Sequence, residues 1–155
     1  MDPIPAAAKY LTLMLNREVF GIAIDKVREI IHAGKITPIA AVSRTVRGII
    51  NVRGRVIPVV DLNARLGLGS QTQECSCVVI VQVHGYKGTP VMMGLAVDGV
   101  GEVLGLETDL GPPEVASYRE TSGLWLIRTA RFNGRNMTLL DIDRVVAPDL
   151  APIPF

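Results

Sequence analysis

Histidine and cysteine, whose side chains often catalyse reactions or bind metals, are scarce in this chain. The 155 residues include two histidines, His32 and His84, which are isolated from each other in the sequence, and two cysteines. Cys75 and Cys77 lie two apart in a strand-like run, where a disulfide between them would be strained and a metal would lack further ligands. We interpret both cysteines as reduced and both histidines as surface or capping residues.

Catalytic signatures are also missing from the sequence. It contains no Walker A motif, no Gly-x-Ser-x-Gly motif, no His-Glu-x-x-His motif and no dinucleotide-binding glycine motif. The glycines of GVGEVLG, residues 99–105, have a different spacing and lie in a strand-turn-strand setting. Asp61 and Asp141 each precede a helix-like segment, which favours N-capping over acid–base catalysis. The sequence therefore predicts a protein that is not an enzyme and uses no cofactor or metal.

Arginines are the most prominent chemical feature of the first half. Five of them fall within 22 residues that contain a single acid, Asp61: Arg44, Arg47, Arg53, Arg55 and Arg65. Arg53 precedes Gly54 at an expected hairpin tip, so its guanidinium is well placed to reach an acidic partner. A solvated basic face is the ordinary alternative. A small basic barrel could also bind nucleic acid, but residues 46–62 include no aromatic side chain to stack on bases.

Composition bounds the class of protein. Hydrophobic residues make up 48% of the chain and charged residues 20%, enough for a real core, and aromatics make up only 5%, so Val, Ile and Leu must form it. A net charge of +1 does not suggest a general nucleic-acid or membrane binder. The apolar runs are far shorter than the roughly 20 residues of a transmembrane helix, and MDPIPAAAK does not resemble a signal peptide. We expect a cytoplasmic location without membrane insertion.

An internal repeat is the most informative pattern. FGIAIDKVREII at residues 20–31 resembles MGLAVDGVGEVL at residues 93–104, an offset of 73 residues. GRVIPVVDL at residues 54–62 resembles GRNMTLLDI at residues 134–142, an offset of 80 residues. Because the two matches occur in the same order, we interpret them as a duplication.

The repeat predicts two small units that pack on each other. They span about residues 10–68 and 75–146, joined by the polar segment 69–74. Each unit is close to the lower size limit of an independent domain. Extra residues of the second unit fall in a Pro-rich loop at 107–122, and the Pro-rich tail is expected to be extended or loose.

Each unit is expected to contain about five short strands. In the first, YLTLML and VFGIAI predict one hairpin, and VRGIINV and RVIPVVDL predict another around Arg53 and Gly54. Residues 25–32 suggest a turn or two of helix behind an Asp25 cap, because Val27, Ile30 and Ile31 have helical spacing. LNARLG predicts a short helix that ends at Gly67. Short strands with tight turns favour closed barrels, which leave no exposed edge.

These segments closely resemble the CheW-type coupling proteins of bacterial chemosensory arrays. The resemblance rests on FGIAIDKVREII, TPI, VRGIINVRGRVIPVVDL and MGLAVDGVGEVL, covers residues 9–147 and leaves 1–8 and 148–155 as flexible termini. It implies an all-β fold with short helices, in which two SH3-like five-stranded β-barrels pack around a hydrophobic groove. It also implies a non-enzymatic adaptor that links methyl-accepting chemoreceptor tips to the regulatory domain of a chemotaxis histidine kinase.

The same resemblance implies a receptor-binding set. Four of its residues are apolar and would line the groove, whereas the others match positions linked to receptor coupling. The set is Val27, Glu29, Ile30, Gly48, Arg53, Val100 and Val103. The four apolar residues, Val27, Ile30, Val100 and Val103, could instead belong to an ordinary hydrophobic core between the barrels. The resemblance also implies that the ends of the barrels contact the kinase, but it does not identify the individual residues of these contacts.

Other functions stay open at this stage. A paralogue could serve a non-flagellar chemosensory pathway, such as surface motility or second-messenger control, and gene neighbourhood would separate these. A small-barrel nucleic-acid binder would show strong salt-dependent binding to generic nucleic acid. A hydrolase or metal enzyme is a remote third alternative. Metal analysis of the purified protein would test whether it binds a metal.

Overall fold

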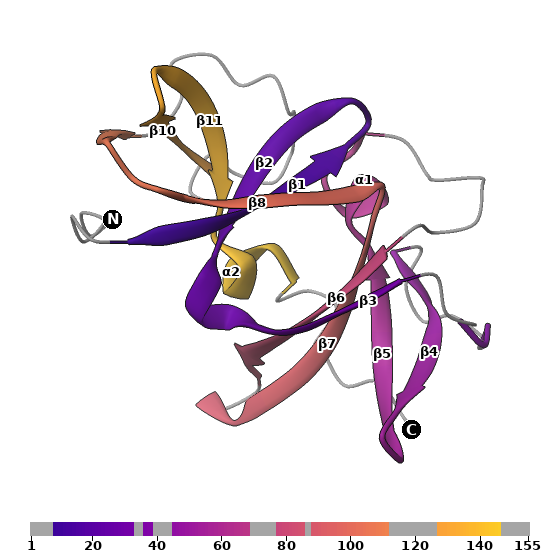
Figure 1. The fold of residues 1–155 in the computed structure, drawn as a ribbon. Coiled ribbons are helices and arrows are strands. Elements are labelled where there is room, and N and C mark those ends of the chain that lie inside the picture. Colours follow the sequence, from indigo (N-terminus) through magenta and orange to yellow (C-terminus); the bar gives the residue numbers. More distant parts are fainter. Residues whose placement is uncertain are drawn as a thin grey trace.

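Eleven strands and three short helices make up the described part of the chain (Figure 1). The structure is a computed structural model that describes residues 8–32, 36–38, 45–68, 77–85, 88–111 and 127–146. The strands are β1 (Lys9–Leu15), β2 (Glu18–Ala23), β3 (Val27–His32), β4 (Val46–Val52), β5 (Arg55–Asp61), β6 (Cys77–His84), β7 (Pro90–Val97), β8 (Gly99–Gly105), β9 (Thr108–Gly111), β10 (Ile127–Phe132) and β11 (Arg135–Leu140). The helices are η1 (Ile24–Lys26), α1 (Leu62–Arg65) and α2 (Ile142–Val146).

The strands form two sheets that each follow the course of a five-stranded barrel. The first has the order β8-β1-β2-β11-β10-β9, and the second has the order β3-β6-β7-β5-β4. Only Leu106 and Glu107 separate β8 from β9, so one bent strand reaches both edges of the first sheet and closes it. In the second sheet, Thr37 follows the edge strand β3 and pairs with Ile49 of the opposite edge strand β4. The predicted all-β fold with short helices is confirmed.

The two barrels exchange strands between the halves of the chain. The first sheet contains β1 and β2 together with β8 to β11, and the second contains β3 to β5 together with β6 and β7. The prediction that one barrel spans about residues 10–68 and the other 75–146 is therefore wrong. A sequence repeat shows which segments are equivalent, but pairing between distant strands is decided by tertiary contacts.

The register of the exchange follows the repeat. β2 pairs in parallel with β11, where Gly21 lies opposite Leu139, and β5 pairs in parallel with β7, where Val59 lies opposite Gly94. Gly94 is the repeat equivalent of Gly21, and Leu139 is the equivalent of Val59. The two parallel pairings, β2 with β11 and β5 with β7, are therefore equivalent and have the same register.

Residues 25–32 do not form the predicted helix. They belong to the short η1 and to β3, which pairs antiparallel with β6. Half-buried and exposed residues alternate along β3, as a strand requires, and Asp25 makes no side-chain cap. The helical spacing of Val27, Ile30 and Ile31 is overridden because these β-branched residues also suit a strand that can pair with β6. Residues 99–105 likewise form one strand, β8, rather than strand, turn and strand.

Both N-capping predictions are confirmed. The Asp61 carboxylate accepts a hydrogen bond from the Ala64 N–H at 3.2 Å and begins α1. The Asp141 carboxylate accepts from the Arg144 N–H at 3.4 Å in front of α2. After α1 the chain turns at Gly67, whose φ is 75°, as predicted for the end of this helix.

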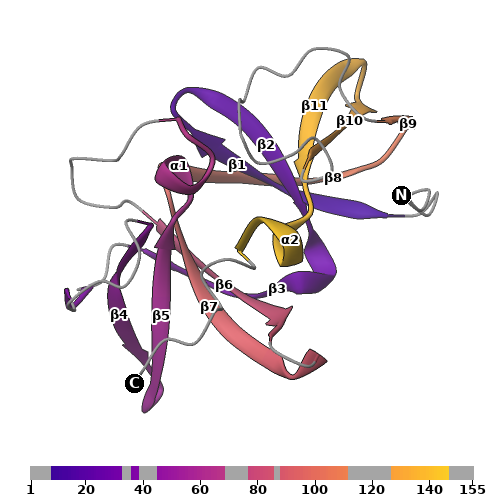
Figure 2. The ribbon, with the colours of Figure 1, turned by 180° about the vertical axis from the view of Figure 1, so that it is seen from behind.

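Three apolar clusters form the core. One cluster lies within each barrel, and the third and largest joins residues of both sheets with Leu62 of α1 and with Ile142, Val145 and Val146 of α2. Both views of the ribbon place α2 between the sheets (Figures 1 and 2). Val, Ile and Leu dominate the shared cluster and the cluster of the second barrel, as the composition predicts, whereas Tyr10, Ala130, Phe132 and Met137 make up most of the cluster of the first barrel. The linker 69–74, Arg44, Cys75, residues 112–122 of the Pro-rich loop and residues 148–155 lie outside the described residues.

Candidate functional site

The tip of the β4–β5 hairpin is a tight turn that presents Arg53. Val52 pairs with Arg55, so only Arg53 and Gly54 form the loop, and both have positive φ, 51° and 80°. Positive φ at both central residues is the pattern of a type I′ turn, which suits the twist of a hairpin. The Gly54 N–H donates to the Asn51 Oδ1 at 3.1 Å. Arg53 is therefore held at the hairpin tip, as predicted.

Glu29 holds the Arg53 side chain in the isolated protein. The Nη1 atom of Arg53 lies 3.0 Å from Oε1 of Glu29, and its Nη2 atom donates to Oε2 at 3.3 Å. This two-point geometry orients the guanidinium plane. The Arg53 side chain is still 78% exposed. The pair joins β3 to the hairpin of β4, the strands at opposite edges of the second sheet, so two residues predicted separately form one structural unit.

Gly48 on β4 is not part of the exposed surface of the hairpin, and its role is to let another part of the backbone approach the strand. It is buried, and its φ is 154°, a conformation that side-chain-bearing residues rarely adopt. A Cβ atom added to it would lie 2.1 Å from the carbonyl oxygen of Thr37. The absence of a side chain therefore lets Thr37 pair with Ile49 and complete the barrel around β4.

The four apolar candidates divide into an inner and an outer pair. Val27 on β3 and Val100 on β8 are half-buried and pack against the core that the barrels share. Ile30 on β3 and Val103 on β8 are 39% and 44% exposed. The members of each pair are equivalent in the repeat. The inner pair thus has a core role, and the outer pair offers apolar surface.

Sequence reasoning missed two residues beside this site. Arg28 donates from Nε to the Gln82 Oε1 at 3.1 Å and from Nη1 to the Asp25 carbonyl at 2.7 Å, which ties β3 to β6. Val56 on β5 is 58% exposed although Ile57, the next residue, is buried, and two adjacent apolar residues contain no signal of this difference. The contact between Arg28 and Gln82 depends on the pairing of β3 with β6, so no local sequence pattern could predict it.

A charged cluster fixes the chain just before β3. Asp143 on α2 contacts the Lys26 Nζ at 2.6 Å, accepts the His84 backbone N–H at 2.8 Å and lies 3.5 Å from the His84 Nδ1. Partial burial raises the pKa of Asp143, but the hydrogen bonds from Lys26 and His84 and their positive charges outweigh it, so the pKa lies below its ordinary value. The cluster ties α2 and β6 to the start of the strand that carries Glu29.

The described part of the chain contains neither a metal-binding cluster nor a membrane-spanning helix. In the part of the chain that the structure describes, no three or more His, Cys, Asp and Glu side chains gather as a metal site would require. None of the helices in those ranges is long and apolar enough to cross a membrane. His32 Nδ1 lies 3.8 Å from the sulfur of Cys77, which is buried.

Known proteins resemble this chain along nearly its whole length. Residues 9–149 match the family of the CheW-like domain. The chemotaxis protein CheW of Klebsiella aerogenes is 30% identical over 143 residues, which are 91% of this chain and 82% of the relative. CheW of Rhizobium meliloti is 33% identical over 149 residues, 90% of this chain and 92% of the relative. The crystal structure of the scaffolding protein TtCheW from Thermoanaerobacter tengcongensis superimposes with a TM-score of 0.74 at 27% identity, covering 90% of this chain and 92% of that chain.

Proposed function

The chain belongs to the CheW-like family of non-enzymatic chemotaxis adaptors, and from this premise we propose that it links chemoreceptors to a histidine kinase. One partner would be the cytoplasmic tip of a methyl-accepting receptor, and the other the regulatory domain of the chemotaxis kinase. The protein would act in the cytoplasm, associated with receptor arrays through protein contacts alone. In this role it makes kinase activity respond to the receptor.

The observation that carries the receptor half of this proposal is the orientation of Arg53 by Glu29. The turn holds the backbone, and the two contacts with Glu29 orient the guanidinium while most of the side chain stays exposed. An arginine oriented in this way loses little side-chain entropy when it binds a carboxylate of a partner. We expect an acidic residue on the receptor tip to bind the Arg53 guanidinium. The guanidinium would then either contact both this residue and Glu29 or exchange Glu29 for it.

Apolar contacts would add to this charged contact. A receptor tip is a helical hairpin with an apolar stripe and charged flanks, which suits binding of a helix in a groove. Ile30 and Val103 have the exposure needed to touch such a stripe, and Val27 and Val100 lie deeper, where they shape the surface. Gly48 would act indirectly, by allowing the backbone course that supports the hairpin.

Co-sedimentation with a receptor cytoplasmic fragment and the matching kinase tests the proposal directly. We expect the protein to enter the complex and to make kinase autophosphorylation depend on the receptor. The control is the same mixture without the protein, in which the kinase should not respond to receptor. A folded protein that binds neither partner would contradict the proposal.

A further inference from the structure

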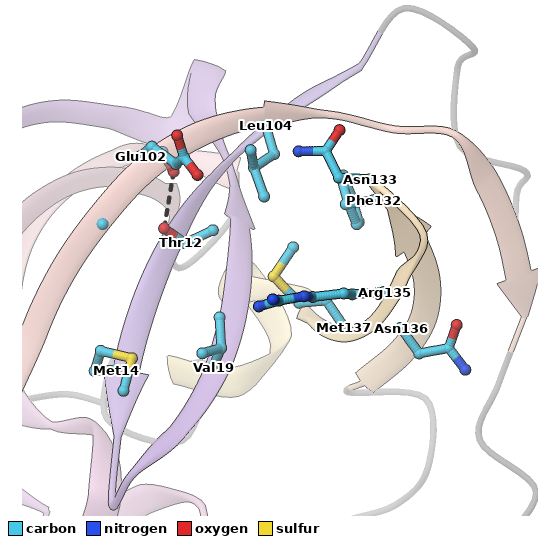
Figure 3. Close-up of a pocket in the computed structure, with 11 residues that line it drawn as sticks. Thr12, Met14, Val19, Glu102, Leu104, Phe132, Asn133, Arg135, Asn136 and Met137 are labelled. Atoms are coloured by element: carbon cyan, nitrogen blue, oxygen red, sulfur yellow. Dashed lines mark hydrogen bonds between the residues drawn. The ribbon is translucent and has the colours of Figure 1, made fainter.

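The first barrel contains a pocket that the proposed function does not use. Its volume is about 610 Å³, and we call it the first-barrel pocket. Figure 3 shows it between β1, β2, β8 and the β10–β11 hairpin, and all of its lining residues come from these strands and the hairpin tip. A volume of this size is within the range of sites that bind small molecules, and the mouths of β-barrels are a common place for such sites.

Two small residues on neighbouring strands make room for this pocket. Gly101 on β8 has no side chain, and a Cβ atom added to it would clash with the Oγ1 of Thr12 on β1. The Thr12 hydroxyl donates to the Glu102 carbonyl oxygen at 2.8 Å, so this buried polar group is satisfied. The repeat and the strand register place Arg28 and Ile80 of the second barrel at the positions of Gly101 and Thr12. The first barrel therefore has smaller side chains at both positions.

The deep part of the pocket is apolar. Phe132 on β10 and Met137 on β11 are 2% and 7% exposed, and Leu104 on β8 packs against the same cluster. Val19 on β2 also lines the pocket but is 47% exposed, so it belongs to the opening. Such a surface favours the hydrocarbon part of a ligand, because contact with it removes apolar area from water.

An arginine is placed over this apolar surface. Figure 3 shows Arg135 extending from β11 across the opening. Among the residues that the structure describes, Arg135 forms no ion pair. Water screens a charge less beside apolar groups than on an open surface, so the guanidinium is well placed to pair with an anionic group of a ligand.

The charges of the lining limit the kind of anion. Glu102 on β8 is the other charged residue of the pocket, so the formal charges of Glu102 and Arg135 cancel. A ligand with several negative charges, such as a nucleotide, would need more than one cation to replace its hydration. The lining therefore favours a ligand with a single negative charge.

We propose that the first-barrel pocket binds a small monoanion with an apolar body, such as a medium-chain fatty acid. Its carboxylate would pair with Arg135, and its hydrocarbon part would contact Phe132 and Met137. The side-chain amide of Asn133 at the hairpin tip can supply a neutral N–H donor to the same carboxylate. The site is separate from Arg53, so binding of this ligand does not depend on whether the protein couples a receptor to a kinase.

Equilibrium dialysis of the intact protein with radiolabelled decanoate tests this inference. We expect saturable binding of one decanoate per chain. Decanol and decylamine have the same chain without the negative charge, and both should bind at least about tenfold more weakly. Arg135→Gln removes the charge and keeps a polar side chain, so it should weaken decanoate binding about tenfold and leave decanol binding nearly unchanged.

Three further variants provide the controls. Val19→Trp adds a large side chain at the opening and should weaken binding of both decanoate and decanol at least about fivefold. Val56→Trp makes the same change at an exposed position of the second barrel, and Arg131→Gln removes an exposed charge from β10 outside the pocket. Both of these should leave decanoate affinity within about twofold. Thermal melting monitored by circular dichroism would establish that each variant is folded.

The inference is overturned if decanoate does not bind, if decanol or decylamine binds as tightly as decanoate, or if folded Arg135→Gln binds decanoate like the wild type. Binding of several decanoate molecules that folded Val19→Trp leaves unchanged would be adsorption to the surface and would also overturn it.

Discussion

At the scale of single residues, Arg53 shows how a local turn and a distant partner together prepare a side chain for binding. Gly54 was the signal in the sequence, and the hairpin tip follows from it. The contact with Glu29, 24 positions away, was not predictable from any local pattern. An exposed pair of this kind contributes at most about 1 kcal/mol to stability, so its value lies in orienting the guanidinium.

Arg53→Glu should weaken association with a receptor fragment at least about tenfold, because it replaces the oriented cation with a carboxylate beside Glu29. Co-sedimentation over a concentration series measures the loss. Arg55→Glu is the matched control, since it makes the same charge change at the neighbouring exposed position and should bind nearly normally. Wild-type binding by a folded Arg53→Glu protein would contradict the assigned role.

Gly48→Ala should lower the free energy of unfolding by about 3 kcal/mol, because φ 154° is strained for alanine and the new Cβ would meet the Thr37 carbonyl. Urea unfolding monitored by circular dichroism measures this. Gly54→Ala is the control, with positive φ but no atom within 4 Å of the new Cβ, and should cost only about 1 kcal/mol. Equal losses for the two variants would mean that the clash at Gly48 is relieved.

At the scale of elements, β3 carries much of the candidate site and is also the element that sequence reasoning assigned wrongly. Its residues have helical spacing, but pairing with β6 decides the conformation. The strand turns Glu29 toward the hairpin of β4 and divides the apolar residues into half-buried Val27 and exposed Ile30. A helix here would have placed these three residues differently, so the site depends on this pairing.

Val27→Asp should lower the free energy of unfolding by about 2–3 kcal/mol, because the carboxylate would enter the core that the two barrels share. Ile30→Asp on the same strand is the comparison. It should cost less than about 1 kcal/mol, since Ile30 is 39% exposed, and should instead weaken receptor binding. Thermal melting and co-sedimentation separate the two effects, and the reverse pattern would refute this division between core and surface.

Asp143→Asn should destabilise the protein near neutral pH, because Lys26 and His84 lose their anionic partner. The folded-state pKa of Asp143 lies below its ordinary value of 3.8. Its stabilising contribution is therefore present above about pH 3.8 and is lost as the pH falls through the lower folded pKa.

The difference in free energy of unfolding between wild type and Asp143→Asn should consequently narrow as the pH falls below about 3.8. Urea titrations between neutral and strongly acid pH measure this difference. Lys26→Met removes one cationic partner and should show the same narrowing. A difference that stays constant down to the acid limit would contradict the assignment to the Asp143 charge.

At the scale of the whole molecule, the exchange of strands makes the two repeats mutually dependent. Neither barrel can form from one half, because β2 needs β11 and β5 needs β7. The shared core also takes residues from both sheets and both α-helices. The two barrels therefore form one folding unit despite their separate sheets.

Fragments that divide the chain between residues 68 and 77 should be unfolded when separate, since each lacks strands of both barrels. Mixing the fragments should restore a cooperative thermal transition, because the reciprocal pairings can form again between chains. Circular dichroism melting of each fragment and of the mixture measures this. A cooperative transition in either fragment alone would show that one repeat can build its own barrel.

Features that depend on nearby residues could be predicted from the sequence. Local patterns that strands, turns and helix ends require predict the all-β class, the hairpin around Arg53 and Gly54, and the caps at Asp61 and Asp141. The internal repeat is also visible in the sequence, as two matches that occur in the same order. Long-range contacts were needed to establish three further features. Residues 27–32 form a strand, the repeats exchange strands, and Glu29 holds Arg53. Each of these depends on contacts between segments far apart in the chain, whose energies exceed the local preferences that a sequence pattern records.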